Sequence, residues 1–405
     1  MKKRVAQIIC VTAVLAGLAG SFLSYTESAN AIPAFARKYS MSCTTCHAPV
    51  PRLKAYGDEF AGNGFVLQDQ DAPRFYDKTG DENLSLIRDF PLAVRMDGYI
   101  KYESVTDRDI DLTAPYILKL LSGGAISDNL AYYFYFYMSE HGEIVGVEDA
   151  YVMFNNLFNS ELDLYLGQFQ VSDPLFKREL RLTYEDYQVY KTTVGGSKIN
   201  LAYDRGIMLT YGFPTGTDII IEILNGNGLT EADDFKVYDE DKYKSFAGRI
   251  TQDINDYIRI GGFGYYGKED TELTGNANEV WMAGPDITFA YRDVMELNVQ
   301  YMERRDSDPW FDGSADPDVE SRGAMAELIV MPDGDRSRLY GVGVFNWIES
   351  DFENRGGTTY GYPAYKSFTG HVGYLVKTNF RLLGEVTYFP EEEESRALVG
   401  FVSGF

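Results

Sequence analysis

Two-faced segments recur along the chain from about residue 91 onward, and this alternation constrains the fold more than any other feature. In the first segment Leu92 and Val94 lie on one side, whereas Arg95 and Asp97 lie on the other. Because successive side chains of a β-strand point to opposite faces, each such segment predicts a strand with one apolar and one polar face. After the segment that starts near 91, the others lie near 115–126, 130–139, 148–156, 161–171, 199–213, 217–225, 244–253, 256–267, 280–291, 294–304, 324–332, 338–348, 366–377, 379–389 and 395–405.

The connections between these segments alternate between short and long. Residues 127–129 and 377–379 are short, whereas 172–197 and 226–243 are long. Short turns at one end and long loops at the other are typical of bacterial outer-membrane barrels. The connection 390–394 is short where the order requires a long one, and departs from the pattern. We therefore predict an all-β fold, an antiparallel transmembrane β-barrel of about 16 strands.

The long connection 172–197 has two interpretations. It carries charges of both signs, among them Asp173, Lys177 and Arg178. The loop either folds inward and narrows the lumen or lies outside as an ordinary loop, and the sequence leaves both open. A barrel of this size is expected to enclose an aqueous lumen.

Composition agrees with a membrane barrel and excludes one class of partner. The chain has 31 Tyr and 25 Phe, and aromatic girdles are typical of such barrels. Its formal net charge of -24 argues against a nucleic-acid partner, whose phosphates need Lys and Arg. Beyond the N-terminus no run is apolar enough for a membrane helix, so the chain contacts membrane lipid as a barrel or not at all. The terminal Phe405 resembles the sorting signal of outer-membrane barrels.

The first 31 residues have the features of a secretory signal peptide. The positive start Lys2-Lys3-Arg4 precedes a mostly apolar stretch that ends at Leu23, and Ala29-Asn30-Ala31 forms an A-x-A cleavage site. The mature chain is expected to begin at Ile32, with a short segment over 32–90 and the barrel over 91–405. Export and a barrel together predict the bacterial outer membrane as the location.

One motif in the short segment carries chemistry. Cys43-Thr44-Thr45-Cys46-His47 matches C-x-x-C-H, the attachment motif of c-type haem. Cys43 and Cys46 would bond to the two vinyl groups, and His47 would be the proximal ligand of the haem iron. A disulfide would not need the adjacent His, and a zinc site would want a second Cys/His pair, which the sequence lacks. We therefore predict one covalent haem c, which would stabilise a mainly helical or loop segment too short to fold alone.

The flanks of the motif extend the prediction. Phe35 and Tyr39 precede the motif, and Pro49, Pro51 and Asn63-Gly64-Phe65 follow it. This stretch resembles the N-terminal haem segment of the fused monohaem cytochrome–porins of iron-oxidising bacteria, while the rest of the chain resembles them only in architecture. The resemblance implies a haem inside or beneath the lumen, and electron transfer from an extracellular donor, Fe(II) among them, to periplasmic carriers. It leaves the direction and the donor open here.

A low-spin electron carrier usually has a second axial ligand, commonly Met or His. His371 is a candidate distal ligand because it sits mid-strand on a face predicted to be lumenal; the alternative, slightly favoured, is a plain polar lumen residue. His141 falls in a predicted outer loop, which makes it a poorer candidate. Met41 is two residues before Cys43, and this short separation counts against its reaching the far side of the haem. The facing of Met208, Met282 and Met302 is left open.

Carboxylates gather in three predicted outer loops, at 231–241, 306–320 and 391–394. They would attract an extracellular metal ion, such as Fe(II), or another cationic redox partner. The commoner role of such loops is solvation, or Ca²⁺ and Mg²⁺ bridging to surface glycolipid.

Three functions remain in competition. The first, which we expect, is an electron conduit between an extracellular donor or acceptor and periplasmic carriers through the haem. The second is a passive porin with the haem as a structural plug. The third is a haem enzyme or sensor, which would want an open iron position and a catalytic base. Whether the chain acts as an enzyme, for example as an iron oxidase, is left open.

Overall fold

The computed structural model describes a short segment and the whole ring of strands that follows it. The described residues are 34–39, 41–67, 76–77, 80–81, 83–84, 86–88, 90–104, 110–173, 175–239, 241–270, 275–313, 318–354 and 363–405. The predicted signal peptide, residues 1–31, lies outside the described residues.

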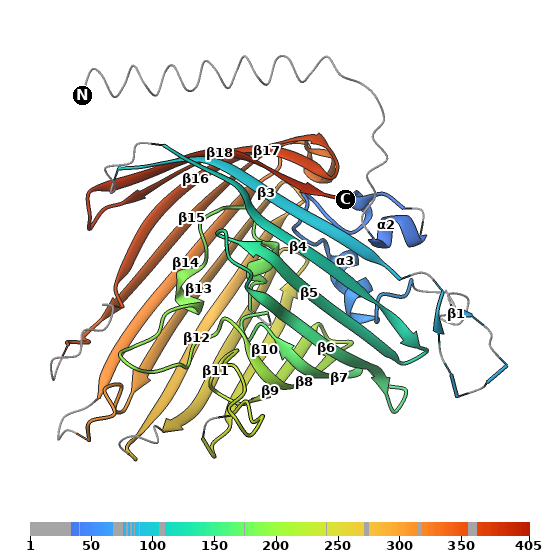
Figure 1. Cartoon of the computed structure of the whole chain (residues 1–405). Coiled ribbons are helices and arrows are strands. Elements are labelled where there is room, and N and C mark those ends of the chain that lie inside the picture. Colours follow the sequence, from blue (N-terminus) through green and yellow to red (C-terminus); the bar gives the residue numbers. More distant parts are fainter. Residues whose placement is uncertain are drawn as a thin grey trace, which may run out of the picture. The chain divides into compact units, whose positions relative to one another are not determined.

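Within the described residues, sixteen strands close into one antiparallel barrel (Figure 1). Each strand pairs with its neighbours along the chain, and the last strand pairs with the first to close the ring. The predicted fold class and strand number are therefore confirmed. The strands are β3 (Leu92–Glu103), β4 (Asp111–Ser127), β5 (Leu130–Glu140), β6 (Gly146–Leu157), β7 (Leu162–Phe169), β8 (Asp204–Phe213), β9 (Thr217–Leu224), β10 (Ser245–Asn255), β11 (Ile258–Asp270), β12 (Ala277–Tyr291), β13 (Met295–Asp306), β14 (Val319–Val330), β15 (Leu339–Ser350), β16 (Tyr365–Lys377), β17 (Phe380–Phe389) and β18 (Glu394–Gly404).

The segment before the barrel is short and mainly helical, as predicted. It contains α2 (Ala34–Tyr39), the 3-10 turn η1 (Cys43–Thr45), α3 (Ala55–Gly62) and the two-residue strands β1 (Tyr76–Asp77) and β2 (Leu86–Ile87). Three further 3-10 turns lie later in the chain: η3 (Arg178–Leu180), η4 (Gln188–Tyr190) and η5 (Gly334–Arg336). Among the described residues, no helix has the length and apolar character needed to cross a membrane.

The two faces of the strands differ as the alternation predicts. On β16, Phe368 and Val372 point outward and are 50% and 55% exposed, whereas Ser367, Thr369 and His371 are buried on the inner face. Large apolar side chains are exposed on the outer face of other strands too, among them Ile221, Phe246, Ile260, Trp281 and Val386. An exposed apolar belt of this kind suits contact with lipid hydrocarbon.

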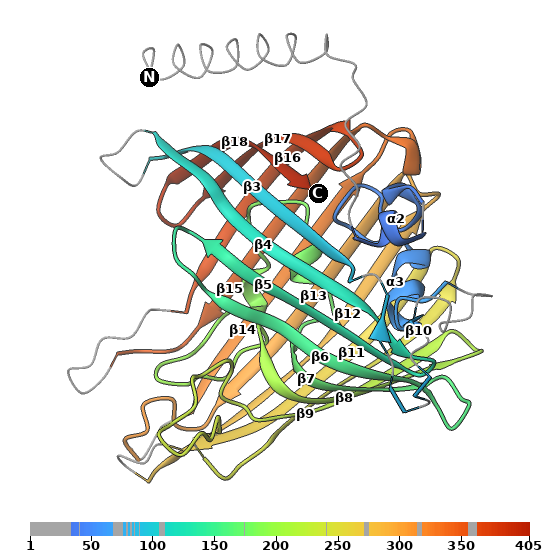
Figure 2. The ribbon, with the colours of Figure 1, turned by 45° about the vertical axis from the view of Figure 1, so that its right-hand side comes forward.

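The two ends of the barrel differ in loop length, which gives each end a name used below. At the short-turn end, β4 and β5 are joined by residues 128–129 and β16 and β17 by 378–379. At the long-loop end, β7 and β8 are separated by 170–203 and β9 and β10 by 225–244. The N-terminal segment, residues 34–67, lies at the short-turn end (Figure 2). There Lys54 forms an ion pair with Asp335 of η5.

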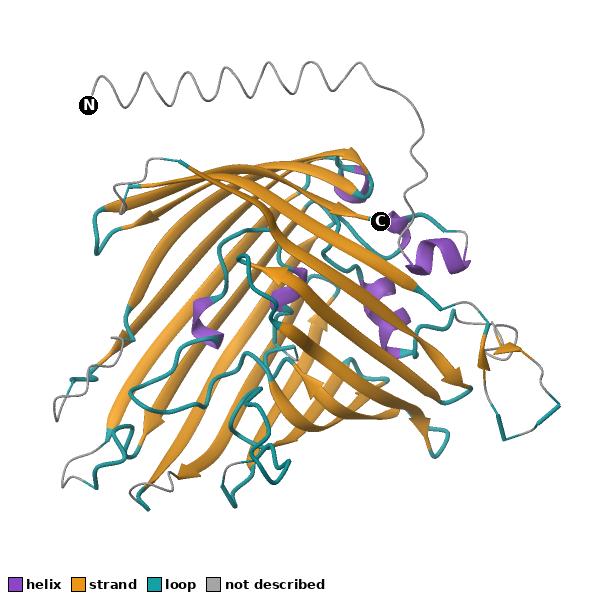
Figure 3. Cartoon of the chain, in the orientation of Figure 1, coloured by secondary structure: helices purple, strands orange, loops and turns teal. Residues whose placement is uncertain are grey.

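The long connection 170–203, the lumen loop, folds into the barrel (Figure 3). The backbone N–H groups of Tyr184 and Glu185 donate to the carboxylate of Glu385 on β17, at 2.8 and 2.9 Å. Farther along the loop, Arg304 on β13 donates to the carbonyl of Ile199 at 2.7 Å. Of the two interpretations left open by the sequence, the inward fold is the observed one.

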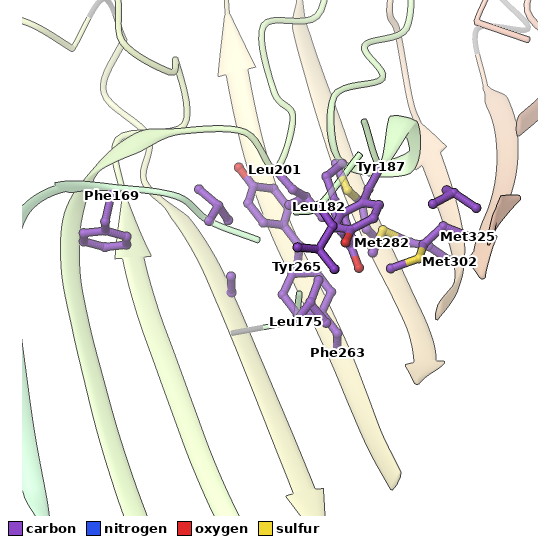
Figure 4. Packing of buried hydrophobic residues seen from close by; sticks show 14 of the residues in the cluster. Phe169, Leu175, Leu182, Tyr187, Leu201, Phe263, Tyr265, Met282, Met302 and Met325 are labelled. Carbon is purple, nitrogen blue, oxygen red and sulfur yellow. The ribbon is translucent and has the colours of Figure 1, made fainter. Parts of the chain in front are cut away.

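Apolar side chains of the lumen loop pack against the inner wall. Leu182, Tyr187 and Leu201 of the loop lie among Tyr265, Met282, Met302 and Met325 of β11 to β14 (Figure 4). All of these side chains are buried. The expectation of an aqueous lumen is therefore wrong for this part of the barrel, because the loop brings its own apolar residues to fill it. The open question about Met208, Met282 and Met302 is settled: all three are buried within this inner cluster.

Candidate haem site

The C-x-x-C-H motif folds into a single tight turn. The Ser42 hydroxyl caps the turn by accepting a hydrogen bond from the Thr44 N–H at 3.3 Å. The His47 N–H then donates to the Cys43 carbonyl at 2.9 Å, so the two ends of the motif lie one turn apart. Cys43 and Cys46 are free thiols and are only partly buried, and burial raises the pKa of both. Two thiols on one short turn are what attachment to two vinyl groups requires.

The ring of His47 is fixed in the form that suits a metal ligand. Its Nδ1 lies 2.8 Å from the Pro51 carbonyl and 3.3 Å from the Arg52 carbonyl. Because a carbonyl oxygen can only accept, Nδ1 carries the proton and Nε2 keeps its lone pair. Burial lowers the pKa of His47, which favours the neutral imidazole. The donor set of Cys43, Cys46 and His47 therefore fits covalent haem c.

Helix α3 packs directly under the motif because of one glycine. A Cβ at Gly57 would lie 2.4 Å from the carbonyl oxygen of Cys46, closer than any side chain can approach. Only glycine permits this contact. The approach brings Phe60 of α3 against Phe35 of α2, with ring centroids 5.3 Å apart, and Phe65 stacks on Phe35 at 5.0 Å.

A cavity of about 290 Å³ opens beside the motif, close to the lower end of the range for small-molecule sites. Its lining brings the predicted haem residues together with aromatic side chains of the segment and of the barrel wall. Apolar aromatic walls would exclude water from a bound macrocycle. The lining includes Cys43, Cys46, His47, Met41, Phe35, Phe60, Phe65, Tyr133, Tyr135 and Tyr151.

Polar contacts hold the segment in the mouth of the barrel. Asn155 on β6 donates to the Gly62 carbonyl at 2.7 Å, and Arg37 donates to the Leu92 carbonyl at 2.6 Å. Arg52 pairs with Glu296 on β13. At Gly64, φ is +67° and an added Cβ would lie 2.8 Å from Asn155 Oδ1, so glycine is needed where the chain passes the wall.

The lumen loop meets the segment on the inner side of the cavity. Lys177 of the loop forms an ion pair with Asp58 of α3 at 2.9 Å. Asp173 lies nearby and lines the same cavity. Burial raises the pKa of Asp173 to about 6, although Lys177 opposes the shift. The two inserted parts of the chain therefore join at the candidate site.

His371 lies elsewhere in the lumen and is not brought to this cavity. It faces inward as predicted, but its Nδ1 lies 3.0 Å from Glu385 Oε2 and its Nε2 lies 3.5 Å from the Tyr340 hydroxyl. Both ring nitrogens thus have protein partners. Iron ligation by His371 stays a prediction, and this geometry does not favour it. Met41, which the sequence placed close to the motif, does line the cavity.

The acidic loops use their carboxylates locally. Asp233 accepts hydrogen bonds from the N–H groups of Phe235 and Val237, and Asp308 caps the N–H of Gly313. In the part of the chain that the structure describes, no group of three or more His, Cys, Asp or Glu side chains could hold a metal ion. Glu240 and Asp316 of these loops lie outside the described residues.

Two features of the site and the lumen were not predicted from the sequence. The tyrosines of β5 line the cavity and the wall above it, and the alternation Tyr133, Tyr135, Tyr137 with Phe134 and Phe136 between them is the signal that could have shown it. The second feature is the apolar character of the lumen loop. Its charges were noted, but Leu182, Tyr187, Tyr190 and Leu201 are the residues that could have predicted a buried loop.

The fold is similar to solved porins over most of the chain. The match with an anion-selective porin from Comamonas acidovorans covers 78% of this chain and 99% of the porin, with a TM-score of 0.57 and 10% identity. The match with the outer membrane channel DcaP of Acinetobacter baumannii covers 78% of this chain and 97% of the channel, with a TM-score of 0.54 and 14% identity. For Salmonella typhi OmpF, solved with daunomycin, the coverage is again 78% and 97%, with a TM-score of 0.54 and 12% identity.

Sequence comparisons add nothing to this: no protein-family model and no curated protein sequence matches the chain. At such low identity the similarity to solved structures concerns the fold. A closed sixteen-stranded barrel with an apolar outer belt agrees with the predicted location in the bacterial outer membrane. The chain has the fold of an outer-membrane porin.

Proposed function

We propose that the chain is an outer-membrane barrel that carries one covalent haem c and passes electrons between periplasmic carriers and an extracellular donor or acceptor. The observation that carries this proposal is the turn of Cys43, Cys46 and His47 beside an aromatic-lined cavity, with Nδ1 of His47 held by the Pro51 carbonyl. In porin barrels the short turns face the periplasm, so the N-terminal segment would meet periplasmic carriers.

Each residue of the site would have a separate task. Cys43 and Cys46 would form the thioether bonds, and His47 would bind the iron through Nε2. A bound haem c supplies one-electron redox chemistry. Phe35, Phe60 and Phe65 would keep water from the macrocycle, because their rings already pack together on the cavity side of α2 and α3.

The filled part of the lumen also supports an electron carrier over a solute channel. A diffusion porin needs a continuous water-filled lumen. Here Leu182, Tyr190 and Leu201 of the lumen loop are buried against the barrel wall, and the N-terminal segment occupies the short-turn mouth. Electrons, unlike solutes, do not need an open passage.

A passive porin with a structural haem is the second candidate, and the similarity to solved porins favours it. A polar cavity of about 760 Å³ also lies at the short-turn end, between Arg52 and Lys54 of the segment and Asp253, Glu296 and Asp335 of the barrel. This candidate predicts solute or ion conductance that does not depend on the redox state of the haem.

One experiment separates the two. Purified haem-loaded protein is inserted into liposomes that contain a trapped electron acceptor, and a membrane-impermeant reductant is added outside. The proposal expects reduction of the trapped acceptor by the parent protein and none by a Cys43→Ser, Cys46→Ser variant. Equal reduction by the two proteins, or conductance without reduction, would contradict the electron-carrier proposal and support the passive porin.

A further inference from the structure

Tyrosines form a continuous file on the inner wall of the barrel, starting at the haem cavity. The ring of Phe65 lies 5.7 Å from that of Tyr133 on β5, centroid to centroid. Tyr133 and Tyr135 are 6.2 Å apart, and Tyr135 and Tyr137 are 5.7 Å apart. Because these tyrosines alternate with outward Phe134 and Phe136, β5 places one phenol after another along its length. The strand itself runs from the end beside α3 toward the long-loop end (Figure 2).

A second group of rings continues toward the long-loop end. Tyr116 on β4 lies 5.2 Å from Tyr99 on β3 and 4.9 Å from Tyr184 of the lumen loop. The ring of His141 lies 4.5 Å from Tyr116, in the tight connection that follows β5. The His141 side chain is 59% exposed, so the file ends at a residue that an extracellular molecule can reach.

The two groups join beside Tyr137. Tyr116 packs against the buried cluster of Ile117, Tyr135 and Tyr137. The guanidinium of Arg181, in the lumen loop, interacts electrostatically with the phenols of both Tyr137 and Tyr116. The rings of Phe65, Tyr133, Tyr135 and Tyr137 thus follow one another from the cavity, and the group from Tyr116 to His141 packs against the cluster that holds Tyr137.

The buried phenols at the centre of the file are each paired with a carboxylate. The Tyr135 hydroxyl donates to Glu148 Oε2 at 2.9 Å, and the Tyr137 hydroxyl donates to Glu179 Oε2 at 2.9 Å. A β-bulge opposite Tyr135, where Phe134 pairs with Ala150 and Phe136 with Val147, turns Glu148 inward to meet it. Glu179 is ionised: burial opposes this, but Lys119 and Arg181 outweigh burial and lower its pKa to about 2.

From this geometry we infer that Tyr135 and Tyr137, the tyrosine relay, carry electrons one at a time between the outer end at His141 and the haem cavity, with Tyr133 and Tyr116 as the flanking aromatic contacts. The inference rests on the proposed function for the identity of the electron acceptor at the inner end. It adds the route through the protein and the class of extracellular partner, a one-electron donor small enough to contact His141 and Tyr116.

The proton and the electron balance within the observed pairs at the two central tyrosines. If Tyr135 gave an electron to the haem site, its phenol would become a neutral phenoxyl and its proton would move along the existing hydrogen bond to Glu148. An electron from an extracellular one-electron donor, such as a reduced metal ion, would then arrive through Tyr137. The Tyr137 proton would move to Glu179 and back, and Glu148 would return its proton to Tyr135. The net change is one electron moved inward and one donor oxidised, and no tyrosine is consumed. Because the proton stays on the neighbouring carboxylate, no net charge builds up on the buried ring.

Simple packing is the alternative explanation, since tyrosines fill space well and their hydroxyls need partners when buried. On the opposite wall most of the buried side chains are aliphatic or carry sulfur, such as Met282, Met302 and Met325, although Tyr265 and Tyr340 also belong to that cluster. A buried phenol paired with a carboxylate also occurs there, at Tyr187 and Glu327. On the β5 wall, however, Tyr133, Tyr135 and Tyr137 follow one another ring to ring. This difference between the walls is what the relay explains and packing does not.

The test attaches a ruthenium photo-oxidant to the haem-loaded protein at position 141, through the thiol of a His141→Cys variant. In that protein Cys43 and Cys46 are held in thioethers, so the new thiol is labelled selectively. A flash oxidises the label, and two signals are followed: oxidation of ferrous haem by its visible absorption, and, with the haem already ferric, the tyrosyl radical by electron paramagnetic resonance. Correct folding of every variant is checked by heat-modifiable migration on gels.

Tyr135→Phe and Tyr137→Phe together are expected to slow haem oxidation about tenfold or more and to reduce the radical signal. The matched control is Tyr301→Phe, because Tyr301 also donates to a carboxylate, Glu303 at 2.9 Å, but lies on β13 away from the file. That variant should behave as the parent does. Unchanged haem oxidation in the double variant would overturn the relay even if electron transfer into liposomes stands. A radical that forms normally while the haem never oxidises would support the relay and count against the proposed function.

Discussion

The N-terminal segment and the lumen loop both enter the barrel, but they are held in different ways. The segment packs Phe60 and Phe65 against Ala131 and Met153 of the wall, and its inner side borders the cavity. Polar contacts of Arg37, Arg52, Lys54 and Asn155 hold its edges. Much of the loop is buried in the lumen, where its apolar side chains join the inner cluster and its turn is bound to Glu385. The loop is therefore part of the barrel's own core, whereas the segment occupies the short-turn mouth and borders a cavity.

Anchoring of the lumen loop is concentrated on buried charges of the wall. Glu385 accepts both N–H groups of the turn at Tyr184 and Glu185, and the Tyr187 hydroxyl donates to Glu327 Oε1 at 2.7 Å. Hydrogen bonds to buried charged groups are among the stronger ones in proteins. The segment has fewer such bonds, and its ion pairs are partly exposed to solvent. A covalent haem would supply the stabilisation that the segment lacks.

The largest expected effect is the loss of covalent haem from the N-terminal segment. Replacing Cys43→Ser and Cys46→Ser removes both sites of thioether formation, so covalent haem should be lost completely while the barrel persists. Haem staining of a denaturing gel measures the first, and heat-modifiable migration measures the second. Thr44→Ala with Thr45→Ala is the matched control, since it changes the same turn but keeps the thiols and His47, and it should retain the haem. Covalent haem in the serine variant would contradict the site.

The next effect concerns the loop. Glu385→Ala leaves the N–H groups of Tyr184 and Glu185, and also His371, without their shared acceptor. Removing one partner of such a buried charged group costs about 3 kcal/mol, so the loop should leave the wall for part of the time. Conductance in planar bilayers and protease cleavage within the loop should both rise. Glu392→Ala, in the exposed turn between β17 and β18, should change neither, and a silent Glu385→Ala would show that the loop is held by packing alone.

The barrel was largely predictable because its signal is repeated in every strand. The alternation of Leu92 and Val94 with Arg95 and Asp97 reappears, with other residues, in all sixteen strands, so errors of a few residues at the ends did not change the count. Side-chain facing followed directly, as for Phe368 and Ser367 on β16. Local periodicity suffices where each strand contacts only its neighbours in sequence.

The site was predictable only in part. The motif named Cys43, Cys46 and His47, because attachment chemistry fixes their spacing along the chain. The surroundings depend on contacts between residues far apart in sequence, such as Gly64 with Asn155 and Lys177 with Asp58, for which no local pattern exists. His371 shows the same limit: its inward facing followed from alternation, but its partners Glu385 and Tyr340 come from neighbouring strands.

A smaller effect is expected at the polar edge of the segment. Lys54→Ala removes the ion pair with Asp335, which is partly exposed and therefore contributes about 1 kcal/mol or less. Protease cleavage between α2 and α3 should become up to about fivefold faster, with the barrel unaffected. Lys377→Ala, an exposed lysine at the same end of the barrel, serves as the control. Cleavage faster by orders of magnitude would mean that the segment is held mainly by charge.

The smallest expected effect tests whether the barrel wall supplies a ligand to the haem iron. Because both nitrogens of His371 face Glu385 and Tyr340, His371→Gln should leave the visible spectrum of the haem unchanged in both redox states. The variant keeps a hydrogen-bonding group beside Glu385, so the lumen loop should also stay in place, as protease resistance would show. A shifted spectrum with an intact loop would show that His371 is a ligand of the haem iron.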